Sequence, residues 1–169
     1  LNHIDALLEP VSNWNLLTAA GNTIRYTFST SGALAYGATG PVRHNGELSA
    51  LNAVQQTNAR TAFEYLSKIT GINFVETADG AAGQIHLVNA DLADAKVAGA
   101  CSWGAPYAYD GLTGEITEYD ADAVIYMDNV EWGTANAALN PGSGGYQTLL
   151  HELGHALGLK HPFKGGIVL

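Results

Sequence analysis

The sequence predicts an α/β (α+β) fold in which a mixed sheet packs against two long helices. A strand pattern is followed by a long helical pattern and then by further strand patterns, an order that favours some parallel pairing. A second helical pattern begins near residue 146 and runs into a stretch rich in histidine. With 169 residues and no internal linker, the chain has the size of one ordinary domain.

The composition is that of a globular protein with few charges. Hydrophobic residues make up 47% of the chain and charged residues 14%, which suffices for a core without disulfides. The net charge is −9 and no Lys/Arg cluster exists, so we expect neither nucleic acid nor a membrane surface as a partner. The single cysteine, Cys101, excludes an intrachain disulfide and is expected to be a small buried residue.

The N-terminal half is expected to contain a helix, a strand and a long helix. Residues 1–9 place apolar side chains at helical spacing, and Pro10 ends the pattern. Residues 22–29 alternate apolar and polar side chains, which is typical of a strand. Apolar residues then recur at spacings of three and four until Gly71 closes the helix. These residues are Leu48, Leu51, Val54, Ala59, Ala62, Phe63, Leu66 and Ile69.

The C-terminal half is expected to contain four strands before its helix. Strands are predicted over 72–77, 84–89 and 122–129, with an irregular strand over 101–109. Residues 133–145 are predicted to form a loop. The apolar face of the following helix is predicted to comprise Leu149, Leu150, Leu153, Ala156 and Leu157.

The stretch HELGHALGLKH, residues 151–161, has the spacing of a metal site. His151 and His155 are four residues apart, so both imidazoles point to the same side of a helix and suit Zn²⁺. Glu152 can lean over the same opening. There it suits a general base that takes a proton from a zinc-activated water.

A third protein ligand is available if the chain leaves the helix abruptly. Gly158 sits where that turn is needed, and glycine accepts positive φ at little cost. His161 can then reach the metal, so that one short stretch supplies three imidazoles and a base. The alternative is a helix with solvent-exposed histidines and no metal.

The pattern HExxHxxGxxH resembles the signature of the metzincin zinc proteases. A proline follows the third histidine, and GGYQTLLHELGHALGLKHPF is similar to the serralysin branch, the secreted alkaline proteases of bacteria. The resemblance implies that His151, His155 and His161 bind one catalytic Zn²⁺ and that Glu152 is the general base. It further implies a twisted, mixed five-stranded sheet with an antiparallel edge strand, backed by two long helices of which the second carries the zinc site.

The resemblance predicts a secreted, bacterial zinc metalloendopeptidase that hydrolyses peptide bonds of protein substrates. Proteases of this kind hold a peptide as an added strand on a sheet edge. Because serralysins have a stretch similar to WGAPYAY, residues 103–109, we expect Trp103, Ala105, Tyr107 and Ala108 to form a substrate-binding rim. A surface loop that packs Trp103 and Tyr107 is the alternative.

Family features that follow the third histidine do not occur within residues 1–169. Neither a methionine nor a tyrosine follows His161, Met127 is expected to fill the core, and GGxGxD repeats are absent. The resemblance therefore implies an upper subdomain through the third zinc histidine, without a Met-turn lower subdomain or a calcium-repeat domain. We expect the C-terminal part of the same protein as a partner, removed or present as a separate chain, and any calcium mainly outside this chain. A reduced protein without a lower half is the alternative.

Two rival functions can be stated. One is a catalytically inactive zinc-binding metzincin-like module, for adhesion or scaffolding, within a larger secreted protein; the intact Glu152 argues against it. The other is a gluzincin, whose third ligand is a downstream glutamate, but no glutamate follows His155. Other polar residues are expected to be structural or surface groups. They are His3, His44, His86 and a solvated acidic turn of Asp120, Asp122 and Asp128, for which calcium binding is the alternative.

Overall fold

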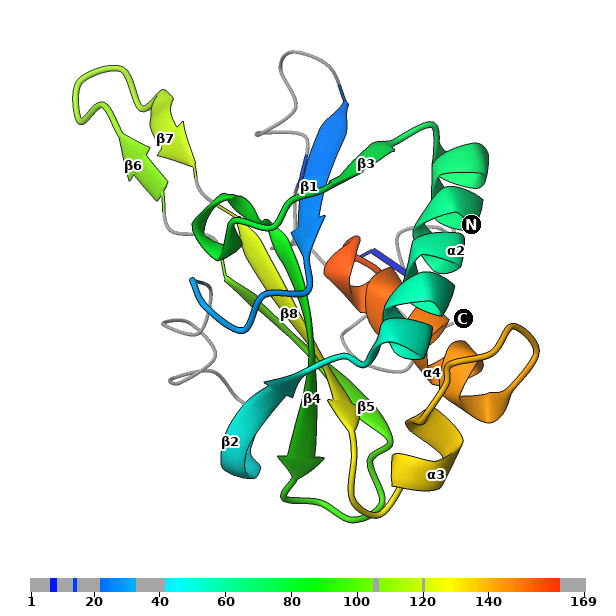
Figure 1. Ribbon diagram of the computed structural model, residues 1–169. Coiled ribbons are helices and arrows are strands. Elements are labelled where there is room, and N and C mark those ends of the chain that lie inside the picture. Colours follow the sequence, from blue (N-terminus) through cyan, green and yellow to red (C-terminus); the bar gives the residue numbers. More distant parts are fainter. Residues whose placement is uncertain are drawn as a thin grey trace.

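The computed structural model describes residues 7–8, 14, 22–32, 42–104, 107–119 and 121–161. Its centre is a twisted mixed sheet with the strand order β3-β1-β4-β8-β5 (Figure 1). The strands are β1 (Thr23–Thr27), β3 (Asn73–Glu76), β4 (Ile85–Leu92), β5 (Gly99–Gly104) and β8 (Asp122–Asp128). Four of them run parallel, and β5 lies antiparallel to β8 at the edge. The predicted five-stranded mixed sheet with an antiparallel edge strand is confirmed.

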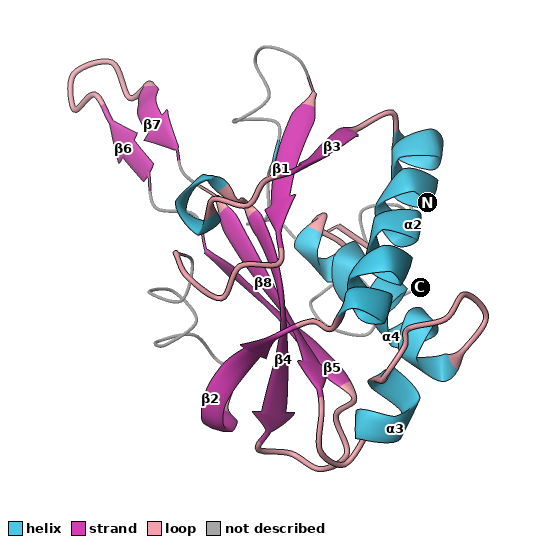
Figure 2. Cartoon of the chain, in the orientation of Figure 1, coloured by secondary structure: helices cyan, strands magenta, loops and turns pink. Residues whose placement is uncertain are grey.

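A sixth strand, β2 (His44–Ala50), pairs antiparallel with the half of β4 that β1 does not reach. A separate hairpin of β6 (Tyr107–Tyr109) and β7 (Ile116–Tyr119) projects away from the main sheet (Figure 1). The predicted irregular strand over 101–109 is therefore two strands, one at the sheet edge and one in the hairpin. Figure 2 shows the same view with the strands of the sheet in magenta and the helices in cyan.

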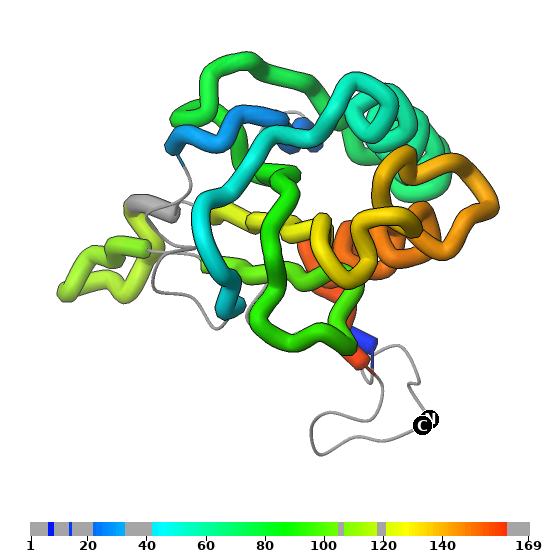
Figure 3. The backbone as a smooth tube through the Cα atoms, turned by 60° about the horizontal axis from the view of Figure 1, so that its bottom comes forward, coloured from blue at the N-terminus to red at the C-terminus, as the bar shows by residue number. Residues whose placement is uncertain are grey.

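Two long helices, α2 (Ala53–Thr70) and α4 (Gly144–Ala156), pack on one face of the sheet. A short helix, α3 (Gly133–Asn136), and a 3₁₀ turn, η2 (Gly80–Ala82), complete the described elements. The predicted loop over 133–145 thus contains a helical turn. Figure 3 shows α2 and α4 on the same side of the sheet. None of the described helices is both long and apolar enough to cross a lipid bilayer.

The long helix begins later than the apolar pattern predicts. Leu48 lies in β2, not in a helix, because residues 44–50 pair with β4. Asn52 caps α2: its side chain accepts the N–H groups of Val54 and Gln55, both at 2.9 Å. Gln55 returns the contact by accepting the N–H of Asn52 at 2.8 Å, which completes a capping box.

Gly71 ends α2 as predicted, with a φ of +74°. The buried face of α2 is narrower than the sequence pattern, because Val54 and Ile69 are 53% and 61% exposed. The buried residues are Gln55, Ala59, Ala62, Phe63 and Leu66.

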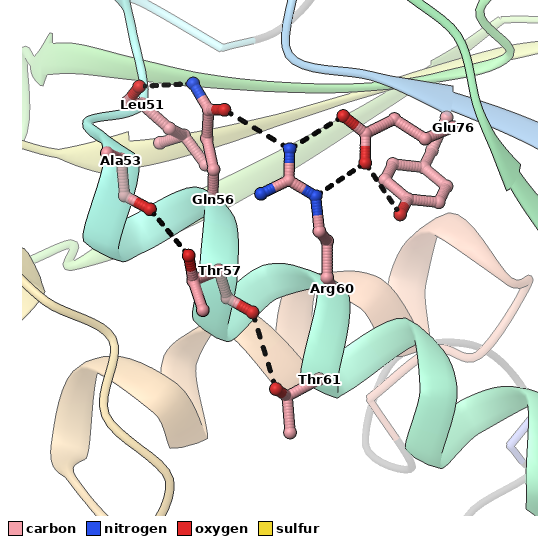
Figure 4. A network of polar contacts seen from close by, with 8 residues as sticks. Leu51, Ala53, Gln56, Thr57, Arg60, Thr61 and Glu76 are labelled. Carbon is pink, nitrogen blue, oxygen red and sulfur yellow. Dashed lines mark hydrogen bonds and ion pairs between the residues drawn. The ribbon is translucent and has the colours of Figure 1, made fainter.

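Polar contacts fix α2 against β3 (Figure 4). Arg60 donates from Nε to Oε2 of Glu76 at 2.7 Å and from its second terminal nitrogen to Oε1 at 2.8 Å. Tyr26 donates its hydroxyl to the same carboxylate at 3.2 Å. The side chains of Arg60 and Glu76 are both more than a third exposed, so their ion pair adds little to the free energy of unfolding. Its main effect is to orient α2 relative to β3.

The prediction of a solvated acidic turn is wrong at Asp128, the last of its three residues. Asp128 is fully buried. Its carboxylate accepts the N–H groups of Val130 and Trp132 through one oxygen and that of Leu92 through the other, at 2.8–3.1 Å. Burial is tolerated because the carboxylate is fully engaged by backbone donors. Asp120, His3 and most of the predicted helix over residues 1–9 lie outside the described residues. The two described residues of that stretch are not helical, because Leu7 lies in a turn and Leu8 forms an isolated antiparallel bridge with Leu159.

Met127 fills the core as predicted, His86 is a buried structural residue, and Cys101, predicted to be buried, is partly buried. Met127 and His86 are buried at 0% and 1% exposure. The Cys101 side chain packs against the core between the sheet and the helices. Burial raises the pKa of the Cys101 thiol, which keeps it in the neutral form.

Candidate metal centre

The helix that carries the histidines is fixed by its apolar face. Ser143 caps α4 by accepting the N–H of Tyr146 at 3.2 Å. Leu149, Leu153 and Ala156 are fully buried against the sheet. Because these residues face inward, the side chains on the opposite flank of α4 face a cleft beside the edge strand β5.

Gly158 turns the chain out of α4 as the sequence predicts. Its φ is +94°, and its N–H donates to the carbonyl of His155 at 2.9 Å. The N–H of Leu159 donates to the carbonyl of Gly154, also at 2.9 Å. These two bonds form a Schellman motif, which needs glycine at the left-handed position. The motif reverses the chain within one turn, so that His161 returns to the helix.

The three predicted histidines converge on one point. Nε2 of His151 lies 2.9 Å from Nε2 of His161 and 3.1 Å from Nε2 of His155. Nε2 of His155 lies 3.2 Å from Nε2 of His161. Ligand nitrogens at 2.0–2.1 Å from a tetrahedral Zn²⁺ stand about 3.3 Å apart, so the spacing fits one ion of that size. The residues present therefore form a possible site for a single zinc ion.

One imidazole is already held in the tautomer that binds a metal. Nδ1 of His155 lies 2.7 Å from the carbonyl oxygen of Leu159. Because a carbonyl only accepts, Nδ1 carries the proton and Nε2 presents its lone pair to the cluster. The pKa of His151 is lowered, first by burial and then by the neighbouring His155 and His161, which also favours the neutral, ligating form.

Glu152 lies behind the histidines, between α4 and β5. It is 6% exposed, and burial raises the pKa of its carboxyl while His155 opposes that rise. No hydrogen bond or ion pair engages its carboxylate from the part of the chain that the structure describes. A buried carboxylate without a structural partner, beside a metal site, is available for proton transfer.

A cleft of about 570 Å³ opens at this point. We call it the histidine cleft. It is lined by the three histidines and Glu152, by Gln147 and Thr148 of α4, and by residues 97–101, which lead into β5. Sequence reasoning missed residues 97–100 and expected Cys101 only as a buried residue. Their short side chains carry no chemical signal, and the predicted antiparallel edge strand was the one feature that pointed to them.

The predicted rim residues lie elsewhere. Trp103 donates its indole N–H to the carbonyl of Ala156 at 3.2 Å and packs edge-on against Trp14, with ring centroids 5.8 Å apart. Tyr107 and Ala108 lie in the β6–β7 hairpin, and none of these three lines the histidine cleft. Ala105 lies outside the described residues.

A cluster of three acidic residues lies apart from the histidines. Carboxylate oxygens of Asp91, Asp128 and Glu131 lie within 4.8 Å of one another. Both oxygens of Asp128 already accept backbone N–H groups, and Asp91 accepts from the side chain of Asn45 at 3.2 Å. These contacts give Asp128 and Asp91 hydrogen-bond partners within the protein.

Comparison with known proteins agrees with the geometry. No protein-family model matches the chain. It is 28% identical over 159 residues to metalloprotease AprA of Pseudomonas entomophila, covering 92% of this chain and 29% of that protein. It is 31% identical over 143 residues to metallopeptidase AprA of Pseudomonas marginalis, covering 82% of this chain and 26% of that protein.

Serralysin of Photorhabdus laumondii is 31% identical over 124 residues, which cover 70% of this chain and 22% of that protein. The chain thus spans roughly a quarter of the length of the curated relatives it matches. With the histidine triad in place, these similarities identify the chain as a homologue of the serralysin and AprA metalloproteases.

Proposed function

We propose that this chain carries the catalytic centre of a zinc-dependent endopeptidase. The observation that carries the proposal is the convergence of three imidazole Nε2 atoms within 3.2 Å beside the buried Glu152. His151, His155 and His161 would hold the ion. Zinc, when bound, supplies a Lewis acid that polarises a scissile carbonyl and lowers the pKa of a water ligand.

Glu152 would act as the general base. Its carboxylate accepts a proton from the attacking water and later passes that proton to the leaving amine. Burial raises the pKa of this carboxyl and so makes the carboxylate a stronger base than an exposed one. The carbonyl of Leu159 keeps the proton of His155 on Nδ1, so that this imidazole remains a ligand and does not compete for the water proton.

The proposals for the parts of the protein outside this chain rest on the resemblance to serralysins. We propose that residues 1–169 form the upper subdomain of a secreted metzincin and that the C-terminal part of the same protein completes the cleft. Calcium is proposed mainly for that other part. A substrate contact through Trp103, Ala105, Tyr107 and Ala108 stays a prediction.

The proposal is tested with Glu152→Gln in the full-length protein. We expect the variant to keep about one equivalent of zinc and to lose at least about 10²-fold in kcat on casein, since general base catalysis contributes that much. Glu115→Gln, at an exposed glutamate of the β6–β7 connection, is the matched control and should cleave normally. A Glu152→Gln variant with normal turnover would contradict the role of this residue.

Removal of zinc with a chelator distinguishes an endopeptidase from a zinc-binding module that is catalytically inactive. An endopeptidase should lose cleavage of casein when zinc is removed and regain it when zinc is restored. Stoichiometric zinc without any chelator-sensitive cleavage would instead favour the zinc-binding, non-catalytic module.

A further inference from the structure

A second cavity, of about 430 Å³, lies close to the histidine cleft. We call it the distal pocket. Its apolar walls come from Val42, Leu92, Val97 and Ala100, and Arg43 and Asp94 stand among its lining residues. Val97 and Ala100 also line the histidine cleft, so the two cavities meet at the start of β5.

The two cavities lie on opposite faces of the sheet. Side chains alternate along a strand, so Ala100 and Cys101 point to opposite faces. Cys101 packs with the core beneath α2 and α4. Ala100 and Val97 pack with the cluster on the other face, which contains Leu92 and Tyr126. The histidine cleft therefore opens on the helix side of β5 and the distal pocket on the other side.

The outer edge of β5 offers backbone groups between the two cavities. The N–H of Asp128 donates to the carbonyl of Ala98 at 3.0 Å, and the antiparallel register then pairs Ala100 with Tyr126. Alternate residues of an antiparallel strand bond to the same neighbour, so Ala98 and Ala100 direct their backbone groups to β8. Gly99 and Cys101 direct theirs outward. Among the described strands, β5 pairs with β8 alone.

A peptide that adds to this edge must alternate its side chains between the two cavities. Residues opposite Gly99 and Cys101 point toward the histidine cleft, and the residue opposite Ala100 points to the other face. When the peptide runs antiparallel to β5, that residue and Ala100 form a non-hydrogen-bonded pair, whose side chains approach most closely. Ala100 itself lines the distal pocket.

We infer that the distal pocket is a specificity subsite, which takes one apolar side chain of a peptide bound along the outer edge of β5. This inference rests on the proposed endopeptidase function. The pocket has room for a leucine or a phenylalanine, and burial of such a side chain against four apolar residues favours it over glycine. Pockets of this kind discriminate by about 10-fold or more between substrates.

The test measures binding separately from cleavage. A fluorescein-labelled Ala/Thr decapeptide is prepared with a single leucine moved through its positions, and its affinity for the zinc-loaded, full-length Glu152→Gln protein is measured by fluorescence anisotropy. We expect leucine at one position to tighten binding by about 10-fold or more over glycine at that position. Val42→Trp, which fills the pocket from a wall not shared with the histidine cleft, should reduce this ratio below about 3-fold.

Val54→Trp, at an exposed position of α2, is the matched control and should keep the ratio. Val42→Ala provides a variant that enlarges the pocket and should shift the preference from leucine toward phenylalanine. Equal affinities for all leucine positions, or a preference that Val42→Trp leaves intact, would overturn the inference. If the parent protein binds with the expected preference but cleaves none of these peptides or casein, the proposed function fails and the subsite stands.

Discussion

Gly99 of β5 and Glu152 of α4 lie in direct contact. A Cβ atom placed on Gly99 would stand 3.2 Å from Cγ of Glu152 and 2.6 Å from Cγ2 of Thr148. The absence of a side chain at residue 99 therefore lets the edge strand lie against the helix at the position of the proposed base.

Gly99→Ala should displace the base without removing the metal ligands. The added methyl group must move Thr148 and press on Glu152, and misplacement of a catalytic group by about 1 Å costs up to about 10²-fold in rate. We expect a fall in kcat of about 10- to 100-fold at unchanged zinc content. Gly111→Ala is the control, because a Cβ atom there meets nothing within 4 Å. Normal kcat in the Gly99→Ala protein would show that the contact is not tight.

Gly158→Ala should weaken metal binding. An alanine at a φ of +94° is strained by about 1–2 kcal/mol, and relief of that strain moves His161 away from His151 and His155. We expect a lower free energy of unfolding and a zinc affinity reduced by about 10-fold or more, measured by competition with a chromophoric chelator. Gly154→Ala is the control. It adds a methyl group only 3.6 Å from Leu159, an ordinary contact, at a helical position where alanine is favoured.

Trp14 and Trp103 should prove coupled in their effect on stability. Both indoles donate to the carbonyl of Ala156, at 2.7 and 3.2 Å, so either one satisfies it when the other is lost. We expect Trp14→Phe and Trp103→Phe each to lose about 0.5–1.5 kcal/mol for the hydrogen bond. The double variant should lose more than their sum, because the buried carbonyl then lacks both donors. Urea denaturation of the four proteins measures the coupling, and additive losses would contradict it.

His86 should make the protein less stable in mild acid. Burial is the main cause of the lowered pKa of His86, against the carbonyl of Gly83, which lies 3.0 Å from Nε2. In the unfolded chain this group titrates near 6.5, so below that pH the unfolded state binds a proton that the folded state does not. The free energy of unfolding should therefore fall as the pH drops below 6.5, by at most about 1.4 kcal/mol per pH unit.

His86→Gln should remove this part of the pH dependence. Urea denaturation at pH 7.5 and pH 5.5 compares the parent and the variant, and the metal-site histidines contribute equally to both. The difference in stability between the two proteins should narrow or reverse at the lower pH. An identical difference at both pH values would mean that His86 does not titrate as expected.

The candidate metal site was predictable because its information is local. His151, His155, Gly158 and His161 fall within eleven residues, and helix geometry plus one glycine turn determines where their side chains go. The strand patterns at 22–29, 84–89 and 122–129 were equally local and also appear in the structure.

Errors arose where distant pairing overrides local pattern. Leu48 continues the helical spacing, but pairing of residues 44–50 with β4 places it in a strand. Asp128 looks like a surface acid until the backbone N–H groups of Leu92, Val130 and Trp132 are brought around it. Residues 97–101 line the histidine cleft because β5 pairs with β8 beside α4. Neither the composition nor the periodicity of the sequence indicates that this strand and helix are neighbours.

The Schellman turn at the end of α4 has a thermodynamic consequence. The burial of Leu149 and Leu153 and the bonds around Gly158 order the histidines through the fold itself. An incoming ion therefore meets an assembled coordination shell, and little of its binding free energy is spent on chain entropy.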